Sequence, residues 1–421
     1  MQPEPAQPLP SAATLGEPAV RCFARQADPV PPAARAVPWV QLKYHTYQPH
    51  IYRNMIGEHS PGIRAGALVA VYDREGRPFG SGFCNLGAKV SLRVFRHGVD
   101  FANEQSCLDA LRRAVELRRD YLTLDKATNA YRVIHADGDG LGGLVVDRYD
   151  DTLAVEVTSL AVFQRLTGWI PTLHDLLGTR HTVISVDEGI ARIEGIDRRL
   201  IPAPTIRAVR IHENGVRYTV DFADGHKTGF FCDQRDNRLK LAGLSAGRRV
   251  LDVCCYTGGF SLSAKLAGAT EVTGVDLDEK AIAQARANAN LNQTRINFVH
   301  ADGFSYTRQM IRNGANWDLV LLDPPKFIDR RDSFEDGLKK YNDLNVLGLQ
   351  LVAPGGLFVS CSCSGLLGAA EFEELVVKAA HRYGLRLQLL ERTSAGADHP
   401  SLSNHPGSRY LKVLWARVLG R

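Results

Sequence analysis

The chain has 421 residues, of which 44% are hydrophobic and 23% are charged, and its formal net charge is +5. This length predicts two or three domains, and the composition is that of a globular protein with sizeable cores. The small positive charge permits a polyanionic partner without requiring one. We expect neither a membrane helix, which needs about 20 apolar residues, nor a secretory signal, because no compact apolar segment follows basic residues near the start.

The eight cysteines indicate the redox environment. Cys254 and Cys255 are adjacent, and Cys361 and Cys363 are separated by one serine, spacings that suit a disulfide framework poorly. No CxxC pair or neighbouring histidine cluster points to a zinc site. We therefore expect no bound metal and a reducing, cytoplasmic location.

The first half of the chain divides into three predicted parts. Residues 1–38 are rich in Pro and Ala without periodicity, which predicts a disordered extension. Residues 39–100 contain short alternating strands with a turn at Asp73–Gly76, which predicts a small β-barrel. Residues 101–212 mix strands with a helix near 160–178, which predicts a central α+β domain.

The segment "NEQSCLDALRRAVELRRDYL" has apolar residues at helical spacing. Its polar side carries four arginines: Arg112, Arg113, Arg118 and Arg119. We expect a solvated helix face, and the alternative is a stripe that contacts the backbone of an RNA.

Residues 213–421 open with a predicted hairpin and then alternate between strands and helices. The strands "RRVLDVCCY", "EVTGVDL", "INFVHAD", "WDLVLLD" and "GGLFVSCS" are nearly continuous apolar runs, as expected when helices cover both faces of a sheet. The predicted fold class is α/β, with a doubly wound, Rossmann-like C-terminal sheet. Its ligands should bind at the carboxyl ends of the strands.

Three acidic residues mark successive strand ends. Asp252 lies on the first strand, Asp276 ends the second and can accept both hydroxyls of a ribose, and Asp302 follows the third, where it can accept from an adenine amino group. Gly258 opens the helix after the first strand, and the absence of a Cβ there permits close approach of a ligand to the backbone.

This pattern resembles class I S-adenosylmethionine-dependent methyltransferases. Cys254 and Tyr256 depart from it, since that family commonly has glycines in this loop. A dinucleotide-binding fold is the alternative, but the GxGxxG motif is absent.

The fourth strand ends in "LLDPPKF", where Pro324 holds Asp323 extended and Pro325 stiffens the loop. Acceptors presented in this way suit planar, amino-bearing groups such as nucleobases. The alternative is that the loop is only a structural turn without a ligand.

The next strand ends in "CSCSG", which separates two kinds of methylation. C5 of cytosine is a poor nucleophile unless a thiolate first adds to C6, whereas methylation of an exocyclic nitrogen needs no thiol. A thiol at this edge therefore favours cytosine-C5 chemistry. For each cysteine the alternative is a small buried hydrophobe, which we favour for Cys361 and disfavour for Cys363.

Five motifs together resemble the RlmI-type large-subunit ribosomal RNA cytosine-C5 methyltransferases. They are "GHKTGFFCDQRDNR" (225–238), "CCYTGGFSLSA", "LDPPKF", "SCSG" and "ADHPSLSNHPGSRYLK" (397–412). The resemblance covers roughly residues 39–418 and includes a barrel similar to a PUA RNA-binding domain. It implies S-adenosylmethionine as cofactor and RNA, specifically 23S ribosomal RNA, as partner.

The resemblance also implies roles for individual residues. It makes Cys363 the nucleophile and Asp323 the residue that binds an extruded cytosine. The implied cofactor contacts are Asp252, Tyr256, Gly258, Asp276, Leu277, Asp302, Gly303, Phe231 and Gln234. The implied substrate contacts are Pro324, Pro325, Lys326 and Lys227. Phe231 stands where the family often has tyrosine, and Lys326 stands where another cytosine-C5 group has a second cysteine.

Two alternatives stay open. One is an enzyme that methylates guanine N2 or adenine N6 with the Asp323 loop and without a covalent intermediate. The other is an RNA-binding module that has lost catalysis. His399 and His405 most simply shape turns, and the oligomeric state, a homodimer included, is left open by the sequence.

Overall fold

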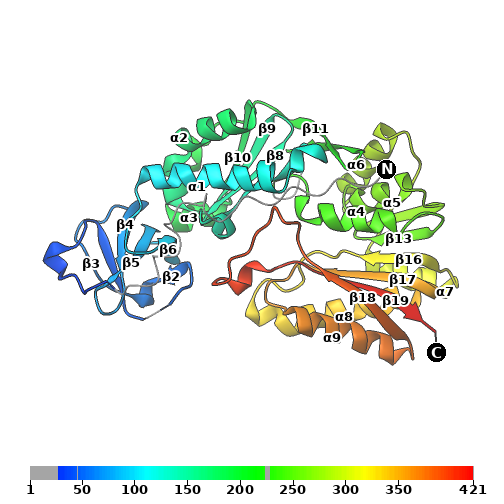
Figure 1. Cartoon of the computed structure of the whole chain (residues 1–421). Helices are drawn as coiled ribbons and strands as arrows, with labels where there is room; N and C mark the ends of the chain where they lie inside the picture. The colour runs from blue at the N-terminus through cyan, green and yellow to red at the C-terminus, as the bar shows by residue number, and fades with distance from the viewer. Residues whose placement is uncertain (1–26, 45, 223–227, 421) are drawn as a thin grey trace, which may run out of the picture. The chain divides into compact units, whose positions relative to one another are not determined.

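The computed structural model describes residues 27–44, 46–222 and 228–420. The chain forms two compact units, Met1–Cys107 and Leu108–Arg421. The second unit contains a four-stranded sheet, a hairpin and a seven-stranded sheet (Figure 1). Within the described residues, no helix has the length and apolar character needed to cross a membrane.

The first unit is built on six strands in the order β2-β6-β5-β4-β1-β3. Their bounds are β1 (Trp39–Leu42), β2 (His50–Tyr52), β3 (Ile56–His59), β4 (Ala67–Tyr72), β5 (Pro78–Cys84) and β6 (Val90–His97). The expected turn after β4 is confirmed, with the amide of Gly76 donating to the carbonyl of Asp73 at 3.1 Å. Alternating residues of these strands, such as Val40, Val71 and Leu92, form a closed apolar core.

The end of the predicted extension packs against this unit. Val30 donates its amide to the carbonyl of Gly76 at 2.9 Å. The Arg35 guanidinium lies 4.4 Å from the ring centre of Trp39 and 4.8 Å from that of Tyr72, a cation–π arrangement. The disorder expected up to residue 38 is therefore wrong for residues 27–38, while residues 1–26 lie outside the described part of the chain.

The central part of the second unit is a sheet with the order β10-β9-β8-β7. Its elements are α1 (Glu104–Glu116), a π-helical turn (Leu117–Tyr121), β7 (Ala130–His135), β8 (Leu144–Tyr149), β9 (Thr152–Val157), α2 (Leu160–Leu177), β10 (His181–Ser185) and α3 (Glu188–Glu194). This sheet and the C-terminal sheet belong to one compact unit, so a domain boundary at residues 212 and 213 stays a prediction.

Arg118 corrects the expectation of a solvated arginine face. Its side chain is fully buried and forms a bidentate ion pair with Asp139, at 2.6 and 2.9 Å. The π-helical turn interrupts the helical spacing on which the expectation depended, and this change accompanies the inward position of Arg118. Arg118 is therefore unavailable to an RNA backbone, whereas Arg112 is exposed and pairs with Asp109.

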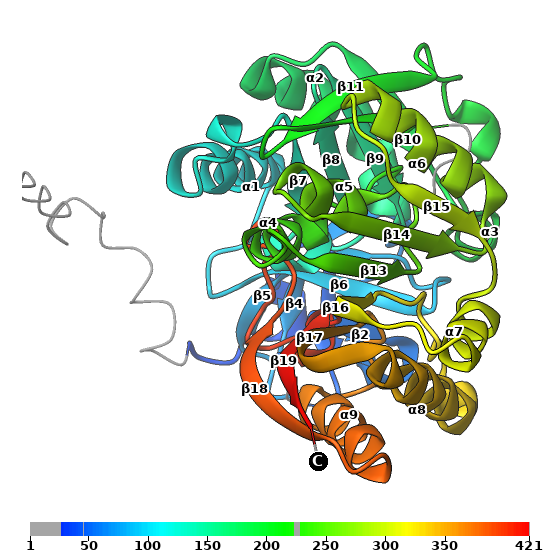
Figure 2. The same ribbon diagram turned by 90° about the vertical axis from the view of Figure 1, so that its right-hand side faces the viewer.

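The C-terminal sheet has the order β15-β14-β13-β16-β17-β19-β18, as Figure 2 shows side on. Its strands are β13 (Arg249–Val253), β14 (Glu271–Asp276), β15 (Asn297–His300), β16 (Trp317–Leu322), β17 (Val352–Ser362), β18 (Arg386–Thr393) and β19 (Lys412–Leu419). The five predicted strands are confirmed and parallel, whereas β18 and β19 were not predicted. β19 runs antiparallel between β17 and β18.

Helices cover both faces of this sheet, which confirms the doubly wound prediction. They are α4 (Arg235–Gly243), α5 (Gly259–Leu266), α6 (Glu279–Leu291), α7 (Gly303–Arg312), α8 (Phe334–Gln350) and α9 (Ala369–Arg382). The hairpin of β11 (Ala208–Glu213) and β12 (Val216–Asp221) contacts α6. Strand alternation divides the core, since Leu251 of β13 packs with residues of α8 and Val250 with residues of α5.

Candidate functional site

The order in which the chain adds strands to the C-terminal sheet reverses at β13. This strand pairs with β14 on one side and with β16 on the other. β14 leads outward to β15, and β16 leads outward to β17. The register places Val253 opposite both Val275 and Leu322, so the loops after these strands lie at one edge. This is the topological switch point at which open α/β sheets bind their ligands.

The thiol of Cys254 shows that the predicted strand-end carboxylates converge there. Its pKa is raised well above the usual value, first by burial and then by four negative charges: Asp276, Asp323, Asp252 and Asp302. Four aspartates from different strand ends therefore lie within electrostatic range of one side chain. That these strand ends form one ligand-binding site stays a prediction.

Asp252 fixes the start of the helix that follows β13. Its Oδ2 accepts from the backbone amide of Ser261 at 3.0 Å and from the Ser261 hydroxyl at 2.6 Å. Burial raises the pKa of Asp252 to about 7, although these hydrogen bonds oppose the shift. Its buried Oδ1 accepts no hydrogen bond within the described residues, so one acceptor at the first strand end still lacks a partner.

Asp276 holds the loop after β13 against the end of β14. Its Oδ2 accepts from the amide of Tyr256 at 2.8 Å, and its Oδ1 accepts from the amide of Asp278 at 2.9 Å. A carboxylate oxygen has two lone pairs, so each can still accept from a ligand hydroxyl. Asp276 thus organises the loop, and its expected contact with a ribose stays a prediction.

The loop keeps a glycine-like backbone at two residues that are not glycine. Cys254 and Tyr256 have φ of 66° and 49°, in the left-handed region that side chains disfavour. Gly258 has φ of 84°, and a Cβ there would lie 2.9 Å from the Phe298 ring. Gly258 is therefore required by backbone conformation and by packing against Phe298, in addition to any approach of a ligand.

The remaining predicted cofactor residues lie around the second and third strand ends. Leu277 follows Asp276 and is 67% exposed, an unusual position for a leucine beside buried strands. Asp302 caps α7 by accepting from the amide of Ser305 at 2.8 Å, and Gly303 is the first residue of that helix. These residues form one side of the site.

The segment before α4 contacts the loops after β13 and β16. The Phe231 ring packs edge-on against the Tyr256 ring, with the centres 5.0 Å apart. Gln234 Nε2 donates to Asp323 Oδ2 at 3.2 Å. Both predicted residues are thus brought to the strand ends, whereas Lys227 lies outside the described residues.

Asp323 begins the loop after β16 and donates its amide to the carbonyl of Val253 at 3.1 Å. Burial, followed by the negative charges of Asp233 and Asp252, raises the pKa of Asp323 to about 7. Pro324 is buried and Pro325 exposed. The Lys326 ammonium lies 3.5 Å from Asp329. At neutral pH a carboxyl with this pKa exchanges readily between its protonated and ionised forms.

The two cysteines of the last motif have different surroundings. Cys361 is fully buried within β17, and burial raises its pKa well above the usual value. Cys363 lies beyond the end of the strand and is half-buried, with Sγ 4.0 Å from the carbonyl oxygen of Pro324. The thiol of Cys363 is therefore the one that lies beside the Asp323 loop.

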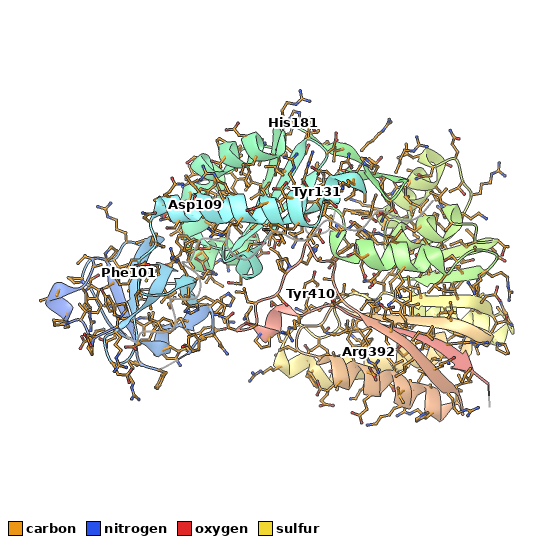
Figure 3. The ribbon with its side chains drawn as sticks, viewed as in Figure 1. Phe101, Asp109, Tyr131, His181, Arg392 and Tyr410 are labelled. Carbon is orange, nitrogen blue, oxygen red and sulfur yellow. The ribbon has the colours of Figure 1, made fainter. Side chains whose placement is uncertain are left out.

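Three further polar residues beside this site, Asp233, Tyr410 and Lys412, belong to the quoted motifs but received no role from them. The Tyr410 hydroxyl donates to Asp233 Oδ2 at 2.6 Å, while Asp233 Oδ1 is buried and accepts no hydrogen bond within the described chain. Tyr410 lies on the segment before β19 (Figure 3). Lys412, at the start of β19, is also buried. The signal was membership of the motifs 225–238 and 397–412, but without β19 nothing placed Tyr410 and Lys412 at the strand ends.

His399 and His405 lie in turns, as expected. The amide of His399 donates to the carbonyl of Gly396 at 2.8 Å, and the amide of His405 donates to that of Leu402 at 3.1 Å. His399 Nδ1 also lies 3.1 Å from Asp398, which accepts two hydrogen bonds from the guanidinium of Arg235. This buried group ties the C-terminal segment to the first turn of α4.

Comparisons with known proteins agree with this geometry. Residues 198–415 match the model of the S-adenosylmethionine-dependent methyltransferase family, and residues 43–97 match that of a PUA-like domain. Ribosomal RNA large subunit methyltransferase I of Shewanella frigidimarina is 33% identical over 384 residues, which covers 88% of this chain and 95% of that protein. The same enzyme of Aeromonas salmonicida is 35% identical over 84% of this chain and 91% of its own length.

A methyltransferase crystallised with S-adenosylhomocysteine has a similar fold, with a TM-score of 0.75 and 22% identity over 90% of this chain and 99% of its own. Fold and sequence together define an S-adenosylmethionine-dependent methyltransferase with an N-terminal PUA-like domain. Within that class, the chain belongs to the family of ribosomal RNA large subunit methyltransferase I.

The strand-end residues fit S-adenosylmethionine. The orphaned acceptor of Asp252, the free lone pairs of Asp276 and the cap residue Asp302 offer acceptors for amino and hydroxyl groups. The exposed apolar side chain of Leu277 offers a surface for a flat ring. A nucleoside has all of these complementary groups.

Proposed function

We propose that this enzyme methylates C5 of a cytosine in large-subunit ribosomal RNA, with Cys363 as nucleophile and Asp323 as acid. We infer the RNA substrate from the names of the relatives, which are ribosomal RNA large subunit methyltransferases. The chemistry is inferred from the site. S-adenosylmethionine supplies the methyl group.

One observation supports the thiol chemistry above the others. Leu322 of β16 lies opposite Ser360 of β17, so the Asp323 loop and Cys363 emerge from adjacent strands. Cys363 Sγ lies 4.0 Å from the Pro324 carbonyl oxygen, so the thiol is next to that loop. A base held by Asp323 would therefore present its edge to a thiol.

The reaction would proceed through a covalent adduct between Cys363 and C6 of the base. The Cys363 thiolate forms a bond to C6 of the cytosine, the C5=C6 electron pair is displaced towards C5, and Asp323 gives its proton to N3. C5 then forms a bond to the methyl group that S-adenosylmethionine would supply, and the sulfonium sulfur would keep the electron pair of the broken S–CH3 bond, leaving as S-adenosylhomocysteine. A proton leaves C5 to water, the S–C6 bond breaks with return of its electrons to sulfur, and the proton on N3 returns to Asp323.

A protonated Asp323 is available for this role because its pKa of about 7 keeps a large share of the acid at neutral pH. The substrate base must leave its stack to reach both groups. Pro324, Pro325 and Lys326 line the same loop and would contact that base, and Lys227 is proposed as a further substrate contact. The cofactor contacts proposed above complete the assignment.

The PUA-like domain is the proposed RNA grip. Among its described residues, Tyr44 is 59% exposed and Tyr52 is 41% exposed, and exposed aromatic rings can stack on unpaired bases. Phosphate contacts by basic residues would make the affinity fall steeply with salt.

Nucleoside mass spectrometry tests the proposal. RNA from a strain that lacks this protein is incubated with the pure enzyme and S-adenosylmethionine that carries a labelled methyl group. We expect the label in 5-methylcytidine. Label in a guanosine or adenosine methylated on its exocyclic nitrogen would overturn the cytosine assignment and favour the alternative in which Asp323 and the prolines act without a thiol.

A further inference from the structure

Lys412 is a buried cation next to the proposed nucleophile. It begins β19, is only 8% exposed, and lies opposite Ser362 of β17, the residue before Cys363. Removing an ammonium from water is unfavourable unless protein groups replace the water, so lysines are rarely buried. The burial of Lys412 beside a thiol therefore needs a reason.

The ammonium is held in place by main-chain carbonyls. Nζ donates to the carbonyl of Ser364 at 2.6 Å and to that of Tyr410 at 2.9 Å. Ser364 directly follows Cys363, so the charge is fixed to the same turn of chain as the thiol. An ammonium has three N–H donors, and the two carbonyls use two of them. One donor is left for a group at this place.

The thiol and the ammonium interact electrostatically. Burial lowers the pKa of Lys412 to about 8, and the negative charge of an ionised Cys363 opposes that shift. Tyr341 of α8 and Cys361 of β17 also interact with Cys363, but they are acids whose ionised forms would disfavour a second negative charge. Asp323, in the neighbouring loop, is also negatively charged when it is ionised, so it too would disfavour a thiolate.

We propose that Lys412 is a positioning residue whose ammonium holds Cys363 as a thiolate, ready to add to the base. This inference rests on the adduct chemistry proposed above. The thiol loses its proton to water, the electron pair stays on sulfur, and Lys412 remains protonated. A positive charge beside a cysteine is a general means of favouring the thiolate, which is the reactive form.

Alkylation of Cys363 by iodoacetamide tests this inference without RNA or methylation. The rate is measured against pH in the full-length protein, with the modified residue located by fragmentation in a mass spectrometer. The variants are Lys412→Met, which removes the charge at similar length, and Lys412→Arg, which keeps it. Lys339→Met, on the exposed face of α8, is the matched control.

We expect Lys412→Met to lower the alkylation rate at pH 7 about tenfold, the effect of a change of one unit in thiol acidity. The midpoint of its rate profile should move to higher pH, while the rate at the alkaline plateau stays unchanged. The plateau separates the two explanations, because a merely structural role would alter access to the thiol and hence the plateau. Lys412→Arg and Lys339→Met should keep the wild-type midpoint.

An unchanged midpoint in Lys412→Met would overturn the inference. The reciprocal measurement covers the case in which this variant fails to fold. In Cys363→Ser, Lys412 should lose its proton at lower pH than in the wild type, followed by NMR of labelled lysine side chains, and an unchanged titration would again refute it. Failure of the cytosine assignment appears separately, as full methylation by a variant without Cys363.

Discussion

Gln234 donates a hydrogen bond from Nε2 to Oδ2 of Asp323, across 3.2 Å. Gln234 precedes α4, and its own Oε1 accepts from Asn237 at 2.7 Å, so the amide is fixed before it meets the carboxyl. This contact joins the segment beside the cofactor site to the loop of the proposed base site. The contact orients the Asp323 carboxyl, and we propose that its other oxygen, Oδ1, faces the substrate base.

We expect Asp323→Asn to lower the single-turnover rate about 10²- to 10⁴-fold, the range for loss of a positioned acid. The amide cannot give a proton to N3, although it can still form hydrogen bonds. In the wild type the rate should fall above about pH 7, because Asp323 with a pKa of about 7 then loses its proton. Asp332→Asn, at an exposed site, is the control. A variant as fast as the wild type would remove Asp323 from the chemistry.

Cys363→Ala should abolish methylation, and Cys361→Ala should retain most of it. The first removes the nucleophile, whereas the second removes a buried sulfur from the core at the cost of some stability. RNA that contains 5-fluorocytosine should form a denaturant-stable adduct with the wild type, because no proton can leave C5. Gel electrophoresis detects the adduct. Full activity of Cys363→Ala would rule out the covalent mechanism and favour methylation of an exocyclic nitrogen.

Asp276→Asn should weaken binding of S-adenosylhomocysteine about ten- to a hundredfold, since a hydrogen bond to a charged group contributes about 1.5–3 kcal/mol. The same change also weakens the contact with the Tyr256 amide that shapes the loop. Isothermal titration calorimetry measures the affinity. Glu271→Gln, at the opposite end of β14, should bind as the wild type does, and equal affinity of both variants would place the cofactor elsewhere.

Asp398→Asn should destabilise the fold by about 3–5 kcal/mol at neutral pH, because it breaks a buried pair and leaves the Arg235 guanidinium without its charge partner. Burial alone would raise the pKa of Asp398, but His399 and Arg235 outweigh it and hold the pKa far below its usual range. Its contribution is therefore present above the unfolded pKa of about 3.9 and is lost as pH falls below that value. Urea unfolding at several pH values measures this difference.

The matched control for this measurement is Asp336→Asn, whose partner Lys339 forms an exposed pair with it. Such pairs contribute about 0–1 kcal/mol, so the control should unfold near the wild-type midpoint. If the stability difference between Asp398→Asn and the wild type persisted unchanged at pH 3, the ionised carboxylate could not be its source.

The alternation of apolar strands and helices predicted the five parallel strands of the C-terminal sheet, with ends within about three residues of the observed bounds. The strand-end aspartates followed, because parallel strands must end at one edge. β19 was missed since its antiparallel entry between β17 and β18 depends on long-range pairing, which local periodicity does not contain. The position of Arg118 was predicted wrongly for a related reason. Its partner Asp139 is close in space, but helical periodicity does not reveal a pair so far apart in the sequence.

The site shows the same division. The motifs predicted Cys363 as the reactive cysteine, which stays a prediction, and Cys361 is fully buried, as the hydrophobe interpretation of that residue requires. The motifs contain Asp233 and Lys412 but did not assign these residues a role, because the surroundings of a side chain are assembled from segments that meet only in the fold. The left-handed backbone at Cys254 and Tyr256 was also beyond the sequence, as both residues normally avoid it.

The position of β19 has a consequence for how the protein is made. β17 pairs along residues 357–362 with β19, and β18 has no other strand partner in this sheet among the described residues. Until residues 412–417 arrive, the apolar strand that leads to Cys363 presents an unpaired edge, a template for pairing with another chain. Truncation before Lys412 should therefore yield aggregates rather than a weaker enzyme. By pairing with β17, β19 prevents that strand from pairing with another chain.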